Sequence, residues 1–138
     1  MNELKFHHLG YATENLDETI GAFESLGFTL INTAKDENQN IRIAVLRKPD
    51  HPLVELITPD NPHNPVNRFL KNNYAIPYHM AYTAKNFDKT LKTLREKGFV
   101  VATKLLPSRA FNNRKIVFLY KKQTGLIELM EEIDIPDD

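Results

Sequence analysis

The chain carries one sequence pattern twice, at a constant spacing of 71 residues. The segment from His8 to Phe28 returns as the segment from His79 to Phe99. The identical pairs are His8/His79, Tyr11/Tyr82, Asn15/Asn86, Asp17/Asp88, Thr19/Thr90, Gly27/Gly98 and Phe28/Phe99. A repeat of this length indicates one supersecondary unit built twice, and two such units can bury a shared core.

Each copy predicts a strand, a helix and then three strands. In the first copy the helix follows the N-cap Asn15 and ends at Gly27, with apolar residues Leu16, Ile20 and Phe23 at the spacing of one buried stripe. The predicted strands are 5–12, 28–33, 41–47 and 53–58 in the first copy, and 78–83, 99–105, 114–121 and 126–131 in the second. Two βαβββ modules of this kind predict an α+β fold in which each set of strands curls into a half-barrel, and two half-barrels enclose a cleft.

The whole chain, 1–138, is expected to form a single domain of two repeats. The first module spans 1–58 and the second 73–133. Residues 59–72, which are rich in proline and asparagine, form a linker with a short helix, and residues 134–138 form a frayed tail.

Composition excludes several classes of function. Lysine plus arginine equals aspartate plus glutamate, 18 each, so no charge excess favours nucleic acid or an anionic membrane. No apolar run approaches the ~20 residues that would cross a bilayer. Cysteine is absent, which excludes disulfides and thiolate chemistry and fits a cytoplasmic protein.

Each copy also carries one histidine and one glutamate at matching places. His8 and His79 lie on the first strand of their modules, and Glu55 and Glu128 lie on the last, inside apolar runs. Taken singly, each histidine fits a hydrogen-bonded core residue and each glutamate an edge residue with its carboxylate in water. Together they predict a metal site, because a buried carboxylate must be protonated, paired or bound to a cation. Two imidazoles and two carboxylates suit Ni²⁺, Co²⁺ or Zn²⁺ first, and also Mn²⁺ or Fe²⁺.

The chain resembles the vicinal oxygen chelate superfamily, which includes glyoxalase I, methylmalonyl-CoA epimerase and the bleomycin-resistance proteins. The marks of this resemblance are the segments 8–11, 54–59, 79–82 and 126–130, and it covers nearly the whole chain. It implies the glyoxalase/bleomycin-resistance/dioxygenase fold, a homodimer, and His8, Glu55, His79 and Glu128 as metal ligands. It further implies proton transfer next to a carbonyl through an enediolate that the metal stabilises, with Glu128 as the base and Glu55 as its counterpart.

The leading hypothesis is therefore a glyoxalase-I-like lyase or isomerase, similar to lactoylglutathione lyase, acting on a thiol hemithioacetal. Glu55 is similar to glyoxalase I, because epimerases usually have glutamine there. However, Ala12 and Pro59 stand where glutathione-dependent enzymes have an arginine and an asparagine that contact glutathione. The alternative is an epimerase acting on an acyl-CoA such as methylmalonyl-CoA. The alternative of another class is a metal-free small-molecule binding or resistance protein.

The sequence also predicts roles for the remaining polar and aromatic residues. Arg114 and Lys115 are expected to bind an anionic group of the substrate, with Arg109 a weaker candidate. Asp36 and Glu37 are expected to lie in a solvated hairpin. The resemblance to the epimerases implies a second base near the third strand, but the register that fits best places Asn38 there, which leaves this base unsupported. Tyr11 and Tyr82 are expected to pack, and His7, His51 and His63 to lie at the surface.

Overall fold

A single nine-stranded mixed sheet carrying two helices makes up the computed structural model, which describes residues 4–133. The first half consists of β1 (Leu4–Thr13), α1 (Leu16–Ser25), β2 (Thr29–Asp36), β3 (Ile41–Arg47) and β4 (Leu53–Pro59). A 3-10 helix, Pro65–Arg68, leads to β5 (Ala75–Ala84), α2 (Phe87–Glu96), β6 (Val100–Val101), β7 (Leu106–Ser108), β8 (Arg114–Lys121) and β9 (Gly125–Glu131). The predicted α+β class and the repeated element order are confirmed, whereas the tail predicted for 134–138 lies outside the described residues.

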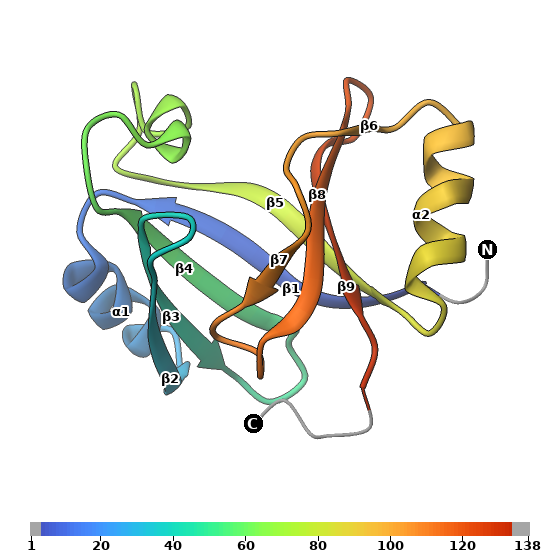
Figure 1. The fold of residues 1–138 in the computed structure, drawn as a ribbon. Coiled ribbons are helices and arrows are strands. Elements are labelled where there is room, and N and C mark those ends of the chain that lie inside the picture. The colour runs from blue at the N-terminus through green and yellow to red at the C-terminus, as the bar shows by residue number, and fades with distance from the viewer. Residues whose placement is uncertain (1–3, 134–138) are drawn as a thin grey trace.

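The two halves join edge to edge through their first strands. The strand order is β2-β3-β4-β1-β5-β9-β8-β6, with β7 beside β8. β1 and β5 are antiparallel neighbours, and each pairs in parallel with the last strand of its own half, β4 or β9. The sheet is open and curved, with β2 and β3 on one side of the central pair and β7 and β8 on the other (Figure 1). The strands that carry the four candidate ligands are therefore consecutive at its centre.

Local sequence signals set both helices. Asn15 and Asn86 cap them by accepting a hydrogen bond from the backbone N–H three residues on, at 3.0 and 3.2 Å. Gly27 and Gly98 end them with a φ of +98°, a conformation that strains any residue with a Cβ. The predicted caps are thus confirmed in both copies. Within residues 4–133 neither helix is long and apolar enough to cross a membrane.

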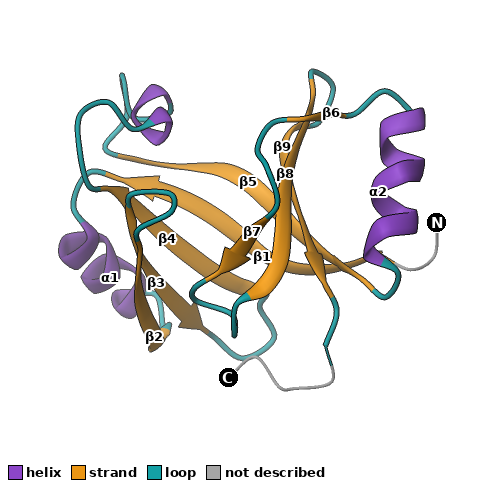
Figure 2. Ribbon diagram, in the orientation of Figure 1, coloured by secondary structure: helices purple, strands orange, loops and turns teal. Residues whose placement is uncertain are grey.

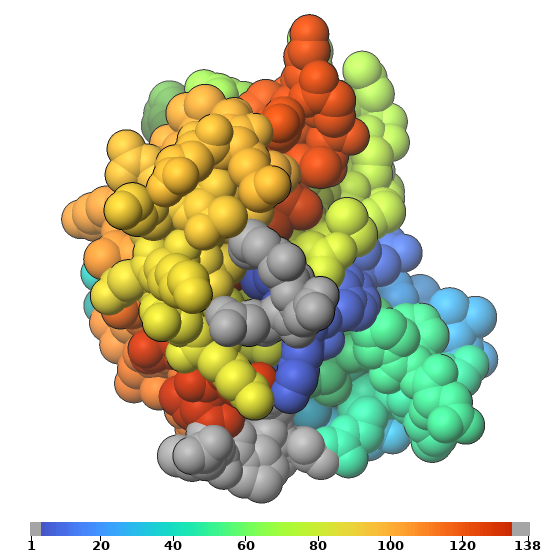
Figure 3. Space-filling view, turned by 90° about the vertical axis from the view of Figure 1, so that its right-hand side faces the viewer, coloured from blue at the N-terminus to red at the C-terminus, as the bar shows by residue number. Residues whose placement is uncertain are grey.

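The core has three parts. α1 covers one end of the sheet and α2 the other, each over its own apolar cluster (Figures 1 and 2). Seen from the side of α2, the yellow residues of that helix form much of the surface (Figure 3). The third cluster joins the two halves across the curved sheet; its members include Ile41, Ile43, Val45, Ile57, Phe111, Ile116, Phe118 and Met130. This shared cluster is the core that the repeat predicted.

The strand predicted for residues 99–105 is wrong in its extent. Only Val100–Val101 pair with β8, and Leu106–Ser108 pair with β8 further along. Between them the Thr103 hydroxyl accepts a hydrogen bond from the Phe118 N–H at 3.1 Å, in place of a backbone carbonyl. This side-chain acceptor keeps β8 satisfied while the chain leaves the sheet, an effect that the apolar pattern alone does not reveal.

Candidate metal centre

The strand register brings the four candidate ligands to one place. Gly10 pairs with both Glu55 and His79, on either side of β1. In the matching position of the other half, Ala81 pairs with both Glu128 and His8. A small residue therefore lies between Glu55 and His79, and another between His8 and Glu128, so that the four larger side chains can converge.

The donor atoms of these side chains form one compact group. His8 Nε2 lies 3.2 Å from His79 Nε2, 3.3 Å from Glu55 Oε1 and 3.4 Å from Glu128 Oε1. His79 Nε2 lies 3.6 Å from Glu55 Oε1 and 3.1 Å from Glu128 Oε1. One ligand atom from each of the four residues lies within 4.8 Å of all the others. All four residues are buried, with at most 4 % of their surface exposed.

This spacing fits a divalent cation. With bonds of about 2.1 Å, neighbouring ligand atoms lie ~3.0 Å apart around an octahedral ion and ~3.4 Å apart around a tetrahedral one. The five distances to the imidazole nitrogens fall close to these values. Two imidazoles with two carboxylates also suit a borderline ion such as Ni²⁺, Co²⁺ or Zn²⁺. The group could therefore hold a metal ion through His8, Glu55, His79 and Glu128.

Electrostatics in the group couple the imidazoles to the carboxylates. Burial lowers the pKa of His8, but the carboxylates of Glu55 and Glu128 outweigh burial and raise that pKa to about 10. Burial raises the pKa of Glu128, but the charge of His8 and the hydrogen bonds from His79 and His8 outweigh it and hold that pKa well below its usual range. The group therefore favours the ionised carboxylate of Glu128, which is the form that binds a cation.

A glycine makes room for one of the two imidazoles. The ring of His79 lies directly over Gly10, and a Cβ at Gly10 would lie 2.5 Å from His79 Nε2 and closer still to two other ring atoms. Real Cβ atoms do not approach other heavy atoms so closely. The absence of a side chain at position 10 is thus a requirement of the metal centre.

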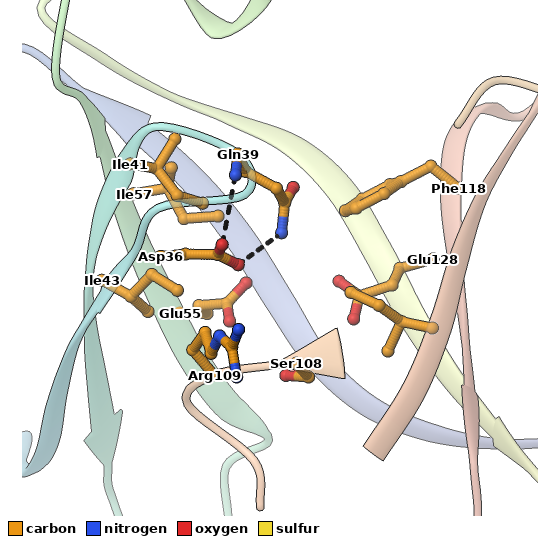
Figure 4. A pocket seen from close by; sticks show the side chains of 11 residues that line it. Asp36, Gln39, Ile41, Ile43, Glu55, Ile57, Ser108, Arg109, Phe118 and Glu128 are labelled. Carbon is orange, nitrogen blue, oxygen red and sulfur yellow. Dashed lines mark hydrogen bonds between the residues drawn. The ribbon is translucent and has the colours of Figure 1, made fainter. Parts of the chain in front are cut away.

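A pocket opens onto the centre and has a polar wall that the sequence interpretation missed. Glu55 and Glu128 face each other from opposite sides of the pocket, and Asp36, Gln39 and Arg109 line it on the side of Glu55 (Figure 4). The prediction that Asp36 is solvated is wrong, because its side chain is buried. Its carboxylate accepts hydrogen bonds from the backbone N–H groups of Asn38 and Gln39 and from the Gln39 amide at 2.9–3.1 Å. The sequence signal for the burial of Asp36 was the apolar run that begins at Ile41, after the hairpin, and not the polar residues of the hairpin tip.

His7 also lies differently from its prediction. It is half-buried, with its ring edge against Phe111 at a centroid distance of 4.7 Å. Phe111 itself is buried and stacks on His8 at 5.2 Å. His51 and His63 are exposed, as predicted. The loop before β8 therefore brings an aromatic ring to the metal centre, and no local pattern had indicated it.

The two predicted substrate-binding residues are not among those that line the pocket. Arg114 is buried and donates a hydrogen bond from Nε to the Glu131 carbonyl at 3.1 Å. Lys115 lies 3.4 Å from Asp88 and over the ring of Phe87, on the side of β8 that α2 covers. The structure therefore does not bring Lys115 to the site, because neighbouring strand residues point to opposite faces. Of the three basic candidates, only Arg109 lines the pocket.

Solved structures with this arrangement of strands are known. Methylmalonyl-CoA epimerase from Mycobacterium tuberculosis is 25% identical, with a TM-score of 0.81 over 93% of this chain and 87% of that chain. A variant of the Streptomyces coelicolor methylmalonyl-CoA epimerase, in complex with 2-nitronate-propionyl-CoA, is 25% identical, with a TM-score of 0.82 over 94% and 98%. A methylmalonyl-CoA epimerase in complex with methylmalonyl-CoA and NH4+ is 26% identical, with a TM-score of 0.83 over 96% and 97%.

Sequence comparison gives the family. No curated protein sequence matches the chain. Residues 7–118 match the model of the Glyoxalase/Bleomycin resistance protein/Dioxygenase superfamily, and this segment includes three of the four candidate ligands. The fold, the duplicated modules and the matched segment agree, and the chain belongs to the Glyoxalase/Bleomycin resistance protein/Dioxygenase superfamily.

Proposed function

We propose that this protein is a metal-dependent enzyme that moves a proton at a carbon atom next to a carbonyl group, and that it acts as an epimerase on an acyl-CoA thioester. The observation that carries the proposal is the buried group of two histidines and two glutamates, whose glutamates line a pocket. The similar solved epimerases, one of them holding methylmalonyl-CoA, support this substrate class over a thiol hemithioacetal.

The two carboxylates suit a reaction that inverts a carbon centre. Glu55 and Glu128 come from different halves of the chain and stand on opposite sides of the pocket (Figure 4). One carboxylate can remove a proton from one face of a substrate while the other returns a proton to the opposite face. A divalent ion held by the four residues would supply a Lewis acid that stabilises negative charge on the substrate oxygen. We assign Glu128 the role of base and Glu55 that of its counterpart.

Apolar side chains around the two carboxylates favour this proton transfer. Ile43, Ile57 and Phe118 line the pocket around the carboxylates. Such a lining excludes water, which strengthens the interaction of Glu128 with a developing charge and protects a carbanion-like species from stray protonation. Gln39 and Arg109, on the wall beside Glu55, are the polar groups available to orient the substrate.

A second candidate is a glyoxalase-type isomerase. Glu55 favours it, since a carboxylate rather than a carboxamide at this position resembles glyoxalase I. The chemistry is again proton transfer beside a carbonyl, but the substrate would be a thiol hemithioacetal. Ala12 is buried and Pro59 ends β4, so neither side chain offers a charged partner for glutathione.

A direct assay separates the two reactions. The protein, loaded with Co²⁺, Ni²⁺ or Zn²⁺, would be incubated in D₂O with methylmalonyl-CoA, and exchange of the proton next to the thioester would be followed by NMR. Parallel reactions would contain methylglyoxal adducts of glutathione and of a small thiol. We expect exchange with the acyl-CoA, and its loss in Glu128→Gln. Turnover of a hemithioacetal, with no exchange in the acyl-CoA, would refute the epimerase and support the glyoxalase-type isomerase.

Metal content tests the alternative of a metal-free binding protein. We expect close to one equivalent of divalent metal per chain after loading and desalting. An unloaded chain that still binds small molecules would favour the binding protein. The homodimer stays a prediction, which sedimentation of the metal-loaded protein would test.

A further inference from the structure

Two β-bulges occupy matching places in the halves of the chain. In the pairing of β1 with β5, Phe6 lies opposite Tyr82 and His8 opposite Ala81, which leaves His7 without an opposing residue. In the same ladder Gly10 lies opposite His79 and Tyr11 opposite Pro77, which leaves Tyr78 without one. His7 and Tyr78 are 71 residues apart, and each directly precedes a candidate metal ligand.

The first bulge turns His7 toward the metal centre. In a regular strand His7 and His8 would point to opposite faces of the sheet, whereas a bulge re-aims one side chain. Here Nδ1 of His7 lies 2.8 Å from Nδ1 of His8, a hydrogen-bond distance. Phe111 contacts both rings, edge-on to His7 and stacked on His8. The ring of His8 is therefore fixed by a hydrogen bond at one nitrogen and by stacking on its face.

The chemistry of imidazole assigns the hydrogen in this contact. His8 Nε2 faces His79, Glu55 and Glu128, so a bound cation would occupy the lone pair of Nε2. The remaining hydrogen of a neutral His8 must then lie on Nδ1. Nδ1 of His8 donates it to His7, and Nδ1 of His7 must accept, with the hydrogen of His7 on its Nε2.

We propose that His7 is a positioning residue of the metal centre: it fixes the tautomer and the ring orientation of His8 by accepting a hydrogen bond from His8 Nδ1. This inference rests on the metal centre of the proposed function, but not on any substrate. Groups that hold the second nitrogen of a metal-binding histidine change metal affinity by about 10–100-fold when they are removed.

The second bulge does not provide the same support. Tyr78 contacts His79 through a ring edge, with centroids 4.5 Å apart. His79 Nδ1 is buried and has no hydrogen-bond partner among residues 4–133. On its Nδ1 side this imidazole is held only by packing among the described residues, over Gly10 and against Tyr78 and Phe118. The metal centre is thus symmetric in its four ligands and asymmetric in their support, with His8 the more firmly oriented histidine.

The test compares two substitutions at position 7. His7→Leu removes the acceptor, whereas His7→Asn keeps an acceptor oxygen near the place of Nδ1. His63→Leu, at an exposed histidine, is the matched control. Zn²⁺ affinity would be measured by chelator competition, and the tautomers of His7 and His8 by ¹⁵N NMR of the Zn²⁺-loaded wild-type protein. We expect about a 10–100-fold loss of affinity in His7→Leu, a much smaller loss in His7→Asn, and none in His63→Leu.

Two results would overturn the proposal. One is a His7→Leu variant that binds Zn²⁺ as tightly as the wild type. The other is a spectrum in which Nδ1 of His7, and not Nδ1 of His8, carries the hydrogen; this reading decides the matter even if His7→Leu does not fold. A wild-type chain that takes up no metal would also refute the metal-dependent function, whereas normal metal uptake with no effect at position 7 refutes the role of His7 alone.

Discussion

Replacement of Gly10 by alanine should weaken metal binding although all four ligands are kept. The new methyl carbon would lie 2.5 Å from His79 Nε2, whereas ordinary contacts begin at 3.4 Å. The imidazole must therefore move by about 0.9 Å or more. Metal–ligand distances vary by only ~0.2 Å, so a shift of this size takes His79 out of ligand range. We expect metal affinity to fall by about 100-fold or more, beyond the range for loss of a supporting hydrogen bond.

Gly21 provides a control with the same chemical change. It lies within α1, and a Cβ there meets nothing within 4 Å. Gly21→Ala should therefore bind metal as the wild type does and gain about 0.5–1 kcal/mol of stability from the helix. Chelator competition would give the affinities, and urea unfolding the stabilities. Equal metal affinity in Gly10→Ala and the wild type would refute the argument that the ring of His79 needs the space over Gly10.

Five further predictions concern protons and local structure. Because the raised pKa of His8 stabilises the metal-free fold fully below its unfolded value of 6.5, we expect the melting temperature of the metal-free protein to fall as the pH rises from 6.5 toward 10. For the same reason, Zn²⁺ binding at pH 7 should release a proton, which calorimetry in buffers of different ionisation enthalpy would detect. The lowered pKa of Glu128 acts at the other end: its stabilisation is present above pH 4.5, and acid titration should remove it as the pH falls through the folded pKa. Asn86→Ala removes the cap of α2 and should cost about 1 kcal/mol in urea unfolding while metal affinity stays unchanged. Asp36→Ala removes three hydrogen bonds that hold the hairpin and the Gln39 amide, and should cost about 2 kcal/mol; an unchanged midpoint would contradict a structural role for this carboxylate.

Much of the fold was predictable because its signals are local and occur twice. Asn15 with Gly27, and Asn86 with Gly98, define two helices through caps that depend only on nearby backbone. The duplication also related the histidines and glutamates before their strands were known to be adjacent. The halves join edge to edge through β1 and β5, so these strands and their neighbours β4 and β9 bring the matching residues together at the centre of the sheet.

The placement of the supporting side chains was not predictable in the same way. The bulge that turns His7 toward His8 depends on the pairing of β1 with β5, a strand about 70 residues away along the chain. His7 was predicted at the surface because it has no histidine counterpart in the second copy, and a shift of one residue in the pairing reverses which face a side chain reaches. Contacts with distant parts of the chain likewise decide where the side chains of Phe111, Asp36 and Lys115 lie.

The amino-acid sequence by itself determined the two-module α+β architecture, the helix boundaries and the identity of the four candidate ligands, since repetition and capping are properties of short segments. The tertiary structure alone decided that Gly10 makes room for His79, that His7 and Phe111 support His8, and that Arg109 rather than Lys115 lines the pocket. The physical reason is that register, bulges and side-chain direction are fixed by partners distant in the chain, and no local pattern encodes which partner a strand will meet.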